Sequence, residues 1–325
     1  MGQRRYLLRR FIQNALTLLV VITIIFALFR ALPGDPSTVL VDPLAPAEVR
    51  AEMVRRLGLD RPLWQQYLAY IRDLGTGDLG RSFLYQRPVT EVLGEKIVNS
   101  LVLVLATFLV AYSLGAAGGV FLAWRRGQRT EVVGNALVLL FRSAPVFWSG
   151  ILAIMLFSFL LDLLPLGGMR SVGRGGETGI ARFLAWDFLY HLILPVMVGA
   201  LHFCGLPLLL VRNTVLEILG EDFMEMARAK GMPTRTLIFK HALRNALLPA
   251  VTASALFIGW AMGGMVLIEY VFSWPGLGRE IVTAVNNRDY PLAQGAFIFI
   301  SLLVMTLNFV ADVLYGYLDP RVRVR

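Results

Sequence analysis

The chain has 325 residues, of which 57% are hydrophobic and only 16% charged, and its formal net charge is +9. A soluble domain carries about a quarter charged residues, so this composition argues against one and indicates a protein whose apolar surface faces lipid. The positive charge does not predict nucleic-acid binding, because Lys and Arg occur in short clusters between apolar runs rather than on one continuous face.

Patterns of common catalytic and metal sites are also missing from the sequence. The one cysteine, Cys204, cannot form an intrachain disulfide, and the three histidines do not have metal-binding spacing. No lysine follows a glycine, so the phosphate-binding loop G-x-x-x-x-G-K-[ST] is absent. G-x-S-x-G and H-E-x-x-H are absent too. We therefore expect no catalytic residue, no cofactor and no metal in this chain.

Long apolar runs predict membrane-spanning helices, since a helix needs roughly 20 mainly apolar residues to cross a bilayer and lipid offers no partner for free backbone groups. Six runs qualify, and the first is too long in its apolar core for a signal peptide. They are Phe11–Leu32, Val98–Trp124, Ala136–Leu164, Phe188–Val211, Leu247–Phe272 and Leu292–Leu318. The predicted fold is an all-α polytopic membrane protein with six transmembrane helices.

Basic residues set the predicted direction of these spans. If the N-terminus is cytoplasmic, Lys and Arg are about twice as dense in the cytoplasmic pieces as in the outer loops, as the positive-inside rule requires. An even number of spans puts both termini in the cytoplasm, and both are basic, "RRYLLRR" and "DPRVRVR". We expect a cytoplasmic N-terminus and a cytoplasmic C-terminus.

Three parts follow from this order. Residues 1–32 form the N-terminal tail and first span, and residues 33–97 form an external subdomain with helix-like stretches near Pro46–Leu57 and Pro62–Leu74. Residues 98–325 form a five-helix core with a polar cytoplasmic loop at 212–246.

The polar loop contains "EMARAKGMPTRTLIFKHALRNALLP", Glu225 to Pro249. Good helix formers with acids in the first turn precede Gly231, which suits a left-handed C-terminal cap, and Pro233 fits the first turn of a second helix. The pattern predicts a knob of helix, glycine corner and helix. Phe223, Met226 and Ala227 are predicted to form one face that enters a groove on another protein. The alternative is a surface loop whose charges only set the topology.

The same loop resembles the "EAA" loop of the membrane subunits of ABC importers. Glu225, Met226 and Ala227 are followed by Gly231, with Met226 in place of the first alanine and the Leu-Pro farther along than in the general pattern. "ARAKG" followed by "HALRNALLP" resembles the dipeptide/oligopeptide/nickel branch. Other stretches resemble that branch in the same order: "ALPGDP", "LGLDRPLWQQYL", "GDLGRSF", "EYVFSWPGLGRE", "NNRDYPLAQG" and "DVLYGYLDPRVR".

The resemblance implies a permease subunit in the cytoplasmic (inner) membrane of a prokaryote. It implies a heterodimer with a second homologous permease, two ATP-binding subunits on the cytoplasmic side and an external solute-binding protein. In this family the loop carries the coupling helix, a role that passes here to Glu225, Met226, Ala227 and Gly231. ATP binding would draw the ATPases together and tilt the spans, which gives alternating access.

Charged residues inside spans are candidates for polar or structural roles. Arg142 is placed near the cytoplasmic end of the third span, where it either snorkels to the headgroups or meets the pore. Glu269 and Asp312 either pair with arginines or line a polar pore. "LGAAGGV" predicts a close-packed helix face, and the aromatics of "YVFSWPG" are expected to anchor at the outer interface.

Several functions stay open at the level of the sequence. Peptides are the default solute, with nickel, glutathione or oligosaccharide as alternatives within the same importer type. A secondary transporter would usually need more spans and ionisable residues at the midplane. A membrane scaffold or enzyme is a third reading, and no nucleophile and base pair supports an enzyme.

Overall fold

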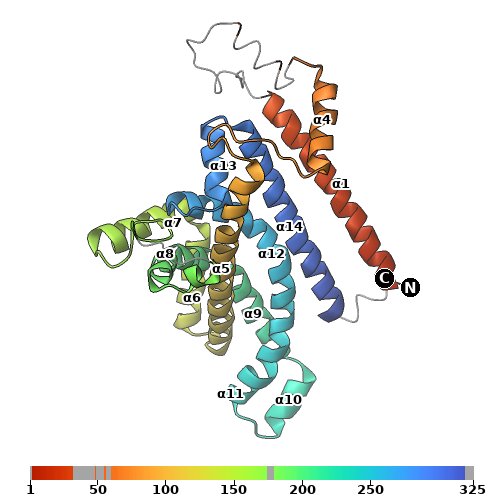
Figure 1. The fold of residues 1–325 in the computed structure, drawn as a ribbon. Coiled ribbons are helices and arrows are strands. Elements are labelled where there is room, and N and C mark those ends of the chain that lie inside the picture. The colour runs from red at the N-terminus through yellow and green to blue at the C-terminus, as the bar shows by residue number, and fades with distance from the viewer. Residues whose placement is uncertain (1, 32–47, 49–54, 56–59, 174–178, 319–325) are drawn as a thin grey trace. The chain divides into compact units, whose positions relative to one another are not determined.

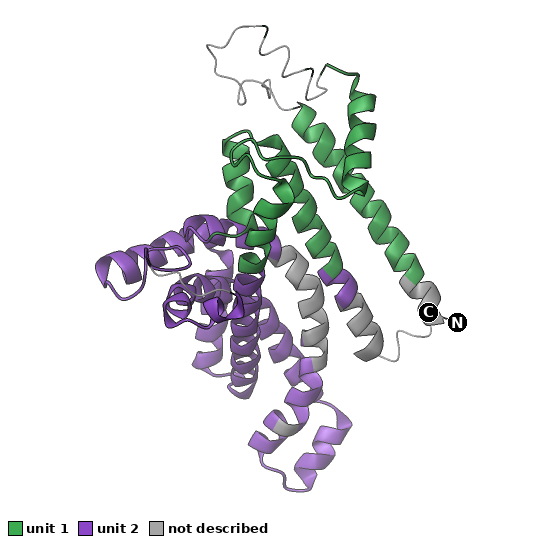
Figure 2. Cartoon of the chain, in the orientation of Figure 1, with its two compact units in different colours: residues 1–100, 275–306 green, residues 101–274, 307–325 purple. Residues whose placement is uncertain are grey.

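The computed structural model describes residues 2–31, 48, 55, 60–173 and 179–318, without the side chains of residues 2–7, 240, 248–249, 251–261 and 311–318. The described part is helical apart from its loops and one isolated bridge between Arg81 and Pro88. The prediction of an all-α protein is confirmed for this part. The chain divides into two compact units, one of residues 1–100 and 275–306 and one of residues 101–274 and 307–325 (Figure 1, Figure 2).

Among its described residues, the first unit begins with two helices that lie wholly within it, and the next helix crosses into the second unit. These are α1 (Gly2–Ala31) and α4 (Leu63–Gly75), followed by the start of α5 (Val89–Trp124). The unit is completed by α13 (Leu277–Asn286) and most of α14 (Tyr290–Leu318). The helix predicted near Pro62–Leu74 is therefore α4, while the one predicted near Pro46–Leu57 lies largely outside the described residues.

Asp289 organises the core of the first unit. Its carboxylate is completely buried and accepts hydrogen bonds from the Ser82 hydroxyl at 2.5 Å and the Leu84 N–H at 2.9 Å. Its other oxygen accepts the Leu292 N–H at 3.2 Å, so Asp289 caps the N-terminus of α14. This residue ties the loop before α5 to α14, around apolar side chains such as Leu93.

The second unit continues α5 and adds α6 (Arg129–Ser143), α7 (Val146–Ala153) and the π-helix η1 (Ile154–Leu160). A short 3-10 helix, η2 (Gly179–Phe183), precedes α8 (Trp186–Phe203) and α9 (Gly205–Ile218). Then come α10 (Asp222–Ala229), α11 (Thr234–Thr236), the π-helix η3 (Leu237–Ala242) and α12 (Leu243–Val271). Within this unit α12 packs against α9, α7 and α8.

The span predicted at Ala136–Leu164 is not one continuous helix, and this prediction was wrong in detail. The helix α6 ends at Ser143, and the axis bends by 100° before α7 and η1. The physical cause is Pro145, because a proline disfavours the helical conformation at the preceding residue, and Ala144 has an extended ψ of 134°. The pair is either a broken span or a re-entrant segment.

The span predicted at Phe188–Val211 is also interrupted. Helix α8 ends at Phe203, and α9 begins at Gly205 and continues to Ile218. Pro207 lacks the N–H that would continue the helical ladder across this point. Among the described residues, four helices are long and apolar enough to cross a membrane, or five if the bent pair counts as one span. The total of six spans stays a prediction. The side chains of residues 251–261 in α12 are not described, and only Met262–Val271 of this helix was assessed, as a shorter apolar helix.

Three glycines on α5 allow α9 to approach closely, which confirms the predicted packing face. A Cβ atom added at Gly115 would lie 2.6 Å from the Pro207 side chain, and one at Gly119 would lie 2.5 Å from the Leu208 carbonyl oxygen. A Cβ atom at Gly118 would meet a Leu208 methyl group at 2.8 Å. At Gly115 and Gly119, where backbone atoms or a rigid proline ring are the neighbours, α5 can carry only hydrogen while the two helices keep this separation.

Of the aromatic residues in "YVFSWPG", Phe272 and Trp274 are core residues rather than interfacial anchors, contrary to the sequence prediction, whereas Tyr270 is 51% exposed. Phe272 and Trp274 are fully buried, and the Trp274 ring lies 5.7 Å from the Phe188 ring. The chain turns sharply here, so that the Gly168 N–H donates to the Phe272 carbonyl oxygen at 2.7 Å. Tertiary packing has drawn into the core side chains that the sequence alone assigns to the interface.

Candidate coupling surface

The predicted knob is present as α10, a glycine corner and the α11–η3 segment. Glu221 is the N-cap of α10, and Asp222 and Glu225 lie in its first turn, where negative charge is favourable toward the helix dipole. Gly231 ends the helix with a φ of +79°. The Gly231 N–H donates to the Arg228 carbonyl oxygen at 2.8 Å, and the chain then turns into Pro233.

The conformation of Gly231, rather than a crowded environment, is what requires glycine. A Cβ atom added there would have no neighbour within 4 Å. A positive φ of this size is disfavoured for residues with a Cβ atom. Pro233 then precedes α11 at a φ of −66°. The geometry expected of this segment is therefore observed.

The knob has an apolar core of its own, which continues into the helical bundle. Met224, Leu237 and Ile238 are buried together with Val120 of α5 and Val211 of α9. The closely packed interior transmits displacements from one helix to the next. A force applied to α10 would therefore reach α5 and α9 through side-chain contacts as well as through the connecting chain.

The outward side of the knob carries exposed apolar side chains. Phe223 is 49% exposed, Met226 61%, Met232 38% and Phe239 47%. Ala227 was predicted to share the face of Phe223 and Met226, but it is partly buried against the knob core. At about 100° per residue, position 227 falls between positions 223 and 224 on the helix, so Ala227 lies at the edge between the two sides.

Charged residues surround this apolar surface. Glu221, Asp222 and Glu225 are exposed near the start of α10, and Arg228 and Lys230 are exposed near its end. An apolar centre with a polar rim is the usual composition of a protein-binding surface. We call the exposed side chains of Phe223, Met226, Met232 and Phe239 the knob surface.

An ion pair that the sequence analysis missed joins α6 to α9, the helix that leads into the knob. Glu131 is buried and accepts the Arg212 Nε–H at 3.0 Å, and a second Arg212 nitrogen contacts the same oxygen. The other Glu131 oxygen accepts the Gly127 N–H at 2.6 Å. The signal in the sequence is a single acid in the basic segment "RRGQRTE". Its partner is 81 residues away, which sequence reasoning could not identify.

The intramembrane candidates Arg142, Glu269 and Asp312 lie on three different helices, α6, α12 and α14. Arg142 is exposed in the last turn of α6, and its side chain passes the backbone of Gly205. Glu269 is buried near the end of α12. The side chain of Asp312 lies outside the described residues. The described residues contain no group of three or more His, Cys, Asp or Glu that could hold a metal ion.

Comparison with known proteins identifies the family. The profile of the family "Binding-protein-dependent transport system inner membrane component" matches residues 115–324. A second profile, "Binding-prot-dependent transport system membrane comp, N-term", matches residues 3–104. Together the two profiles extend over nearly the whole chain, including the glycine-rich stretch of α5 and the knob.

Relatives with similar lengths agree with this match. The chain is 38% identical to the di/tripeptide transport system permease protein DppB of Pseudomonas aeruginosa, over 92% of both chains. It is 35% identical to the dipeptide transport system permease protein DppB of Escherichia coli K12, over 98% of both. It is also 35% identical to the glutathione transport system permease protein GsiC of Salmonella choleraesuis, over 98% of this chain and 99% of the relative.

The fold resembles that of a solved importer. An inward-facing structure of the MetNI methionine ABC transporter superposes with a TM-score of 0.56 over 70% of this chain and 96% of that chain, at 18% sequence identity. At this identity the likeness concerns the fold alone. The resemblance noted in the sequence is confirmed by the profiles and relatives: the chain belongs to the family of binding-protein-dependent transport system inner membrane components, the permeases of ABC importers.

Proposed function

We propose that the chain is the membrane permease subunit of an ATP-driven importer that carries di- or oligopeptides across the cytoplasmic membrane of a prokaryote. Relatives named as dipeptide and di/tripeptide permeases, at 35–38% identity over nearly the full chain, support a peptide as the transported solute. Nickel, glutathione and oligosaccharide remain alternative solutes, and glutathione has direct support from one relative. The catalytic work of ATP hydrolysis belongs to partner subunits.

The observation that carries the coupling role is the knob surface on a packed core. Phe223 and Met226 are exposed on α10, directly beside Met224, which is fully buried in the core shared with α5 and α9. An apolar helix face of this kind fits the groove of another protein. In the proposal that groove belongs to an ATP-binding subunit, and its movement turns α9 and α12 between outward-open and inward-open states.

The proposed assembly has a second homologous permease, two ATP-binding subunits on the cytoplasmic side and an external solute-binding protein. Six spans with both termini cytoplasmic place residues 33–97 outside and the loop at 212–246 inside, in accord with the distribution of Lys and Arg. Glu225, Met226, Ala227 and Gly231 are assigned to ATPase coupling. Arg142, Glu269 and Asp312 are assigned to structural or polar intramembrane roles.

The solute is tested with the purified importer complex in liposomes. Dipeptides and oligopeptides, presented with the solute-binding protein, are expected to stimulate ATP hydrolysis and to accumulate inside. Stimulation by nickel, glutathione or an oligosaccharide, but not by peptides, would replace the proposed solute. Solute accumulation without the ATP-binding subunits would show a secondary transporter instead.

The coupling surface is tested by Met226→Asp, which places a charge at the most exposed side chain of the knob surface. We expect the ATP-binding subunits to dissociate more easily and peptide uptake to fall at least tenfold, since a buried unpaired charge strongly weakens an interface. The matched control is Val285→Asp on α13, where an exposed apolar side chain, 45% exposed, lies outside the knob. Equal peptide uptake in Met226→Asp and Val285→Asp would contradict the assignment of the knob surface to ATPase coupling.

A further inference from the structure

A second surface feature, in the first unit and separate from the knob, is a charged pocket of about 440 Å³. It lies between the last turn of α1, helix α4 and the start of α14, all within one compact unit. Its walls include Arg30, Arg61, Tyr70, Arg72 and Asp73. The transport role proposed above does not use this pocket.

Helix α4 is fixed against α1, so the pocket has a defined shape. The hydroxyl groups of Thr23 and Tyr67 lie 2.7 Å apart and share a hydrogen bond. The Phe26 ring lies 5.3 Å from the Tyr67 ring and 5.6 Å from the Tyr70 ring. Figure 1 shows α4 running beside the end of α1 that carries Arg30.

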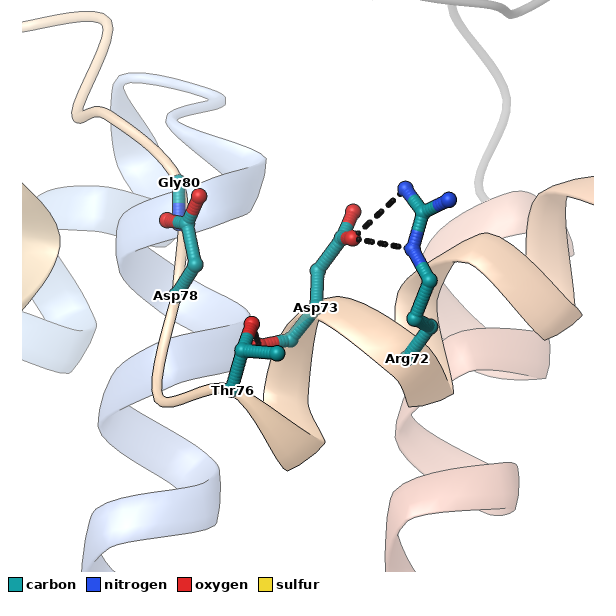
Figure 3. A network of polar contacts seen from close by, with 5 residues as sticks. All are labelled: Arg72, Asp73, Thr76, Asp78 and Gly80. Carbon is teal, nitrogen blue, oxygen red and sulfur yellow. Dashed lines mark hydrogen bonds and ion pairs between the residues drawn. The ribbon is translucent and has the colours of Figure 1, made fainter.

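The acidic residues of the pocket are already engaged within the chain. Asp73 accepts hydrogen bonds from the Nε–H of Arg72 at 3.0 Å and from its Nη2–H at 2.9 Å (Figure 3). Asp78 accepts the Gly80 N–H at 2.8 Å, which closes the turn after α4. The Thr76 hydroxyl donates to the Asp73 carbonyl oxygen at 2.8 Å.

Two arginines of the pocket have no carboxylate partner among the described residues. The Arg30 guanidinium lies over the Phe26 ring, 5.3 Å from its centre, and the backbone of Arg61 is held by the Gln66 side chain at 2.7 Å. The Tyr70 hydroxyl is buried and forms no hydrogen bond in the described part of the chain. Burial raises the pKa of Tyr70 although Arg30 opposes the shift, so this hydroxyl stays protonated and can donate.

These three residues line one cavity, and their donor groups suit an anion with several acceptor oxygens. The position of the pocket identifies the source of that anion. Arg30 is one residue from the end of α1, whose segment Leu8–Ala31 is long and apolar enough to cross a membrane. Leu63, Trp64 and Leu68 of α4 are exposed, and exposed Trp beside Leu is typical of a helix at the lipid–water boundary.

We propose that this pocket binds the phosphodiester of an anionic phospholipid at the end of α1, with the exposed apolar residues of α4 among the acyl chains. Arg30 and Arg61 pair with the phosphate and Tyr70 donates a hydrogen bond to it. The bound lipid holds α4 against α1 at the membrane surface.

The test measures binding of a fluorescent phosphatidylglycerol to the purified importer complex in detergent. Arg61→Gln is expected to weaken binding at least tenfold, the loss of a charge-assisted hydrogen bond, and Tyr70→Phe about three- to tenfold. The matched control is Arg9→Gln, an exposed arginine near the N-terminal end of α1, whose last turn carries Arg30. Arg9→Gln should weaken lipid binding by less than about fivefold, which is the contribution of one unspecific surface charge.

Three outcomes would overturn the proposal. Equal weakening by Arg61→Gln and Arg9→Gln would mean unspecific attraction. Full competition by inorganic phosphate at millimolar concentration would show a site for free anions instead of lipid. Unchanged lipid binding in Arg61→Gln, together with weaker binding of the solute-binding protein, would assign the pocket to a protein partner. Arg61→Gln is the deciding variant, since Arg61 is exposed and precedes α4.

Discussion

The glycines of α5 offer a direct test of how tightly the bundle is packed. Gly119→Ala adds one methyl group at a point where it would lie 2.5 Å from the Leu208 carbonyl oxygen and 3.0 Å from the Arg212 nitrogen. Both atoms belong to the backbone of α9, so the contact can be relieved only by moving a helix. At Gly118 the nearest atom, at 2.8 Å, is the end of the Leu208 side chain, which can rotate away.

The expected magnitude follows from two opposing effects. Alanine is favoured over glycine inside a helix by about 1 kcal/mol, and overpacking costs about 1–3 kcal/mol. Gly94 of the same helix has no neighbour within 4 Å of an added Cβ atom, so Gly94→Ala reports the first effect alone. The difference in free energy of unfolding between Gly94→Ala and Gly119→Ala should therefore be about 1–3 kcal/mol, with Gly118→Ala between them.

The assay is the thermal unfolding midpoint of the purified importer complex in one detergent. One kcal/mol corresponds to about 2–4 °C for chains of moderate length, so Gly119→Ala should unfold several degrees below Gly94→Ala. Equal midpoints for the two variants would refute close packing of α5 against α9.

Three further perturbations test the knob, the ion pair and the cap. Gly231→Val forces a β-branched residue into a left-handed conformation, at a cost of about 1–2 kcal/mol, and should reduce ATP-driven uptake. Gly231→Asn should retain most of the uptake. An equal loss of uptake in both variants would point to a steric cause. Breaking the ion pair with either Glu131→Met or Arg212→Met should cost about 1–3 kcal/mol, and the double variant should recover part of that loss in a thermal double-mutant cycle; simple additivity would argue against direct coupling. Asp289→Ala removes the cap of α14 and should lower the free energy of unfolding by at least about 1–2 kcal/mol. The loop at residues 82–85 should then be cleaved faster by a protease, and an unchanged rate of cleavage would contradict this role of Asp289.

In the proposed function, the knob connects a soluble partner to the membrane bundle through the contacts of one buried cluster. Met224 belongs to the same buried cluster as Val120 and Val215, so the knob and the helices of the second unit move as packed neighbours. The ion pair between Glu131 and Arg212 adds α6 to this group. We expect substitutions in this cluster to affect the ratio of transported solute to hydrolysed ATP more than solute selectivity.

Local chemistry was sufficient for much of the architecture. The apolar runs located the helical segments, because lipid exposure demands about 20 apolar residues in a row. The glycine corner at Gly231 and the helix before it could be predicted because the left-handed conformation and the capping preferences depend on a few neighbouring residues. The order of family motifs along the chain identified the permease family, which the profiles and relatives confirm.

Other features depended on contacts between residues far apart in the chain. The sequence by itself determined that the chain is an apolar helical bundle with a polar knob, since length, hydropathy and glycine act locally. Only the tertiary structure decided which side of α10 is buried and which partners Asp289 and Glu131 bind. The physical reason is that these outcomes depend on which segments meet in space, and hydropathy shows which segments are apolar but not which of them pair.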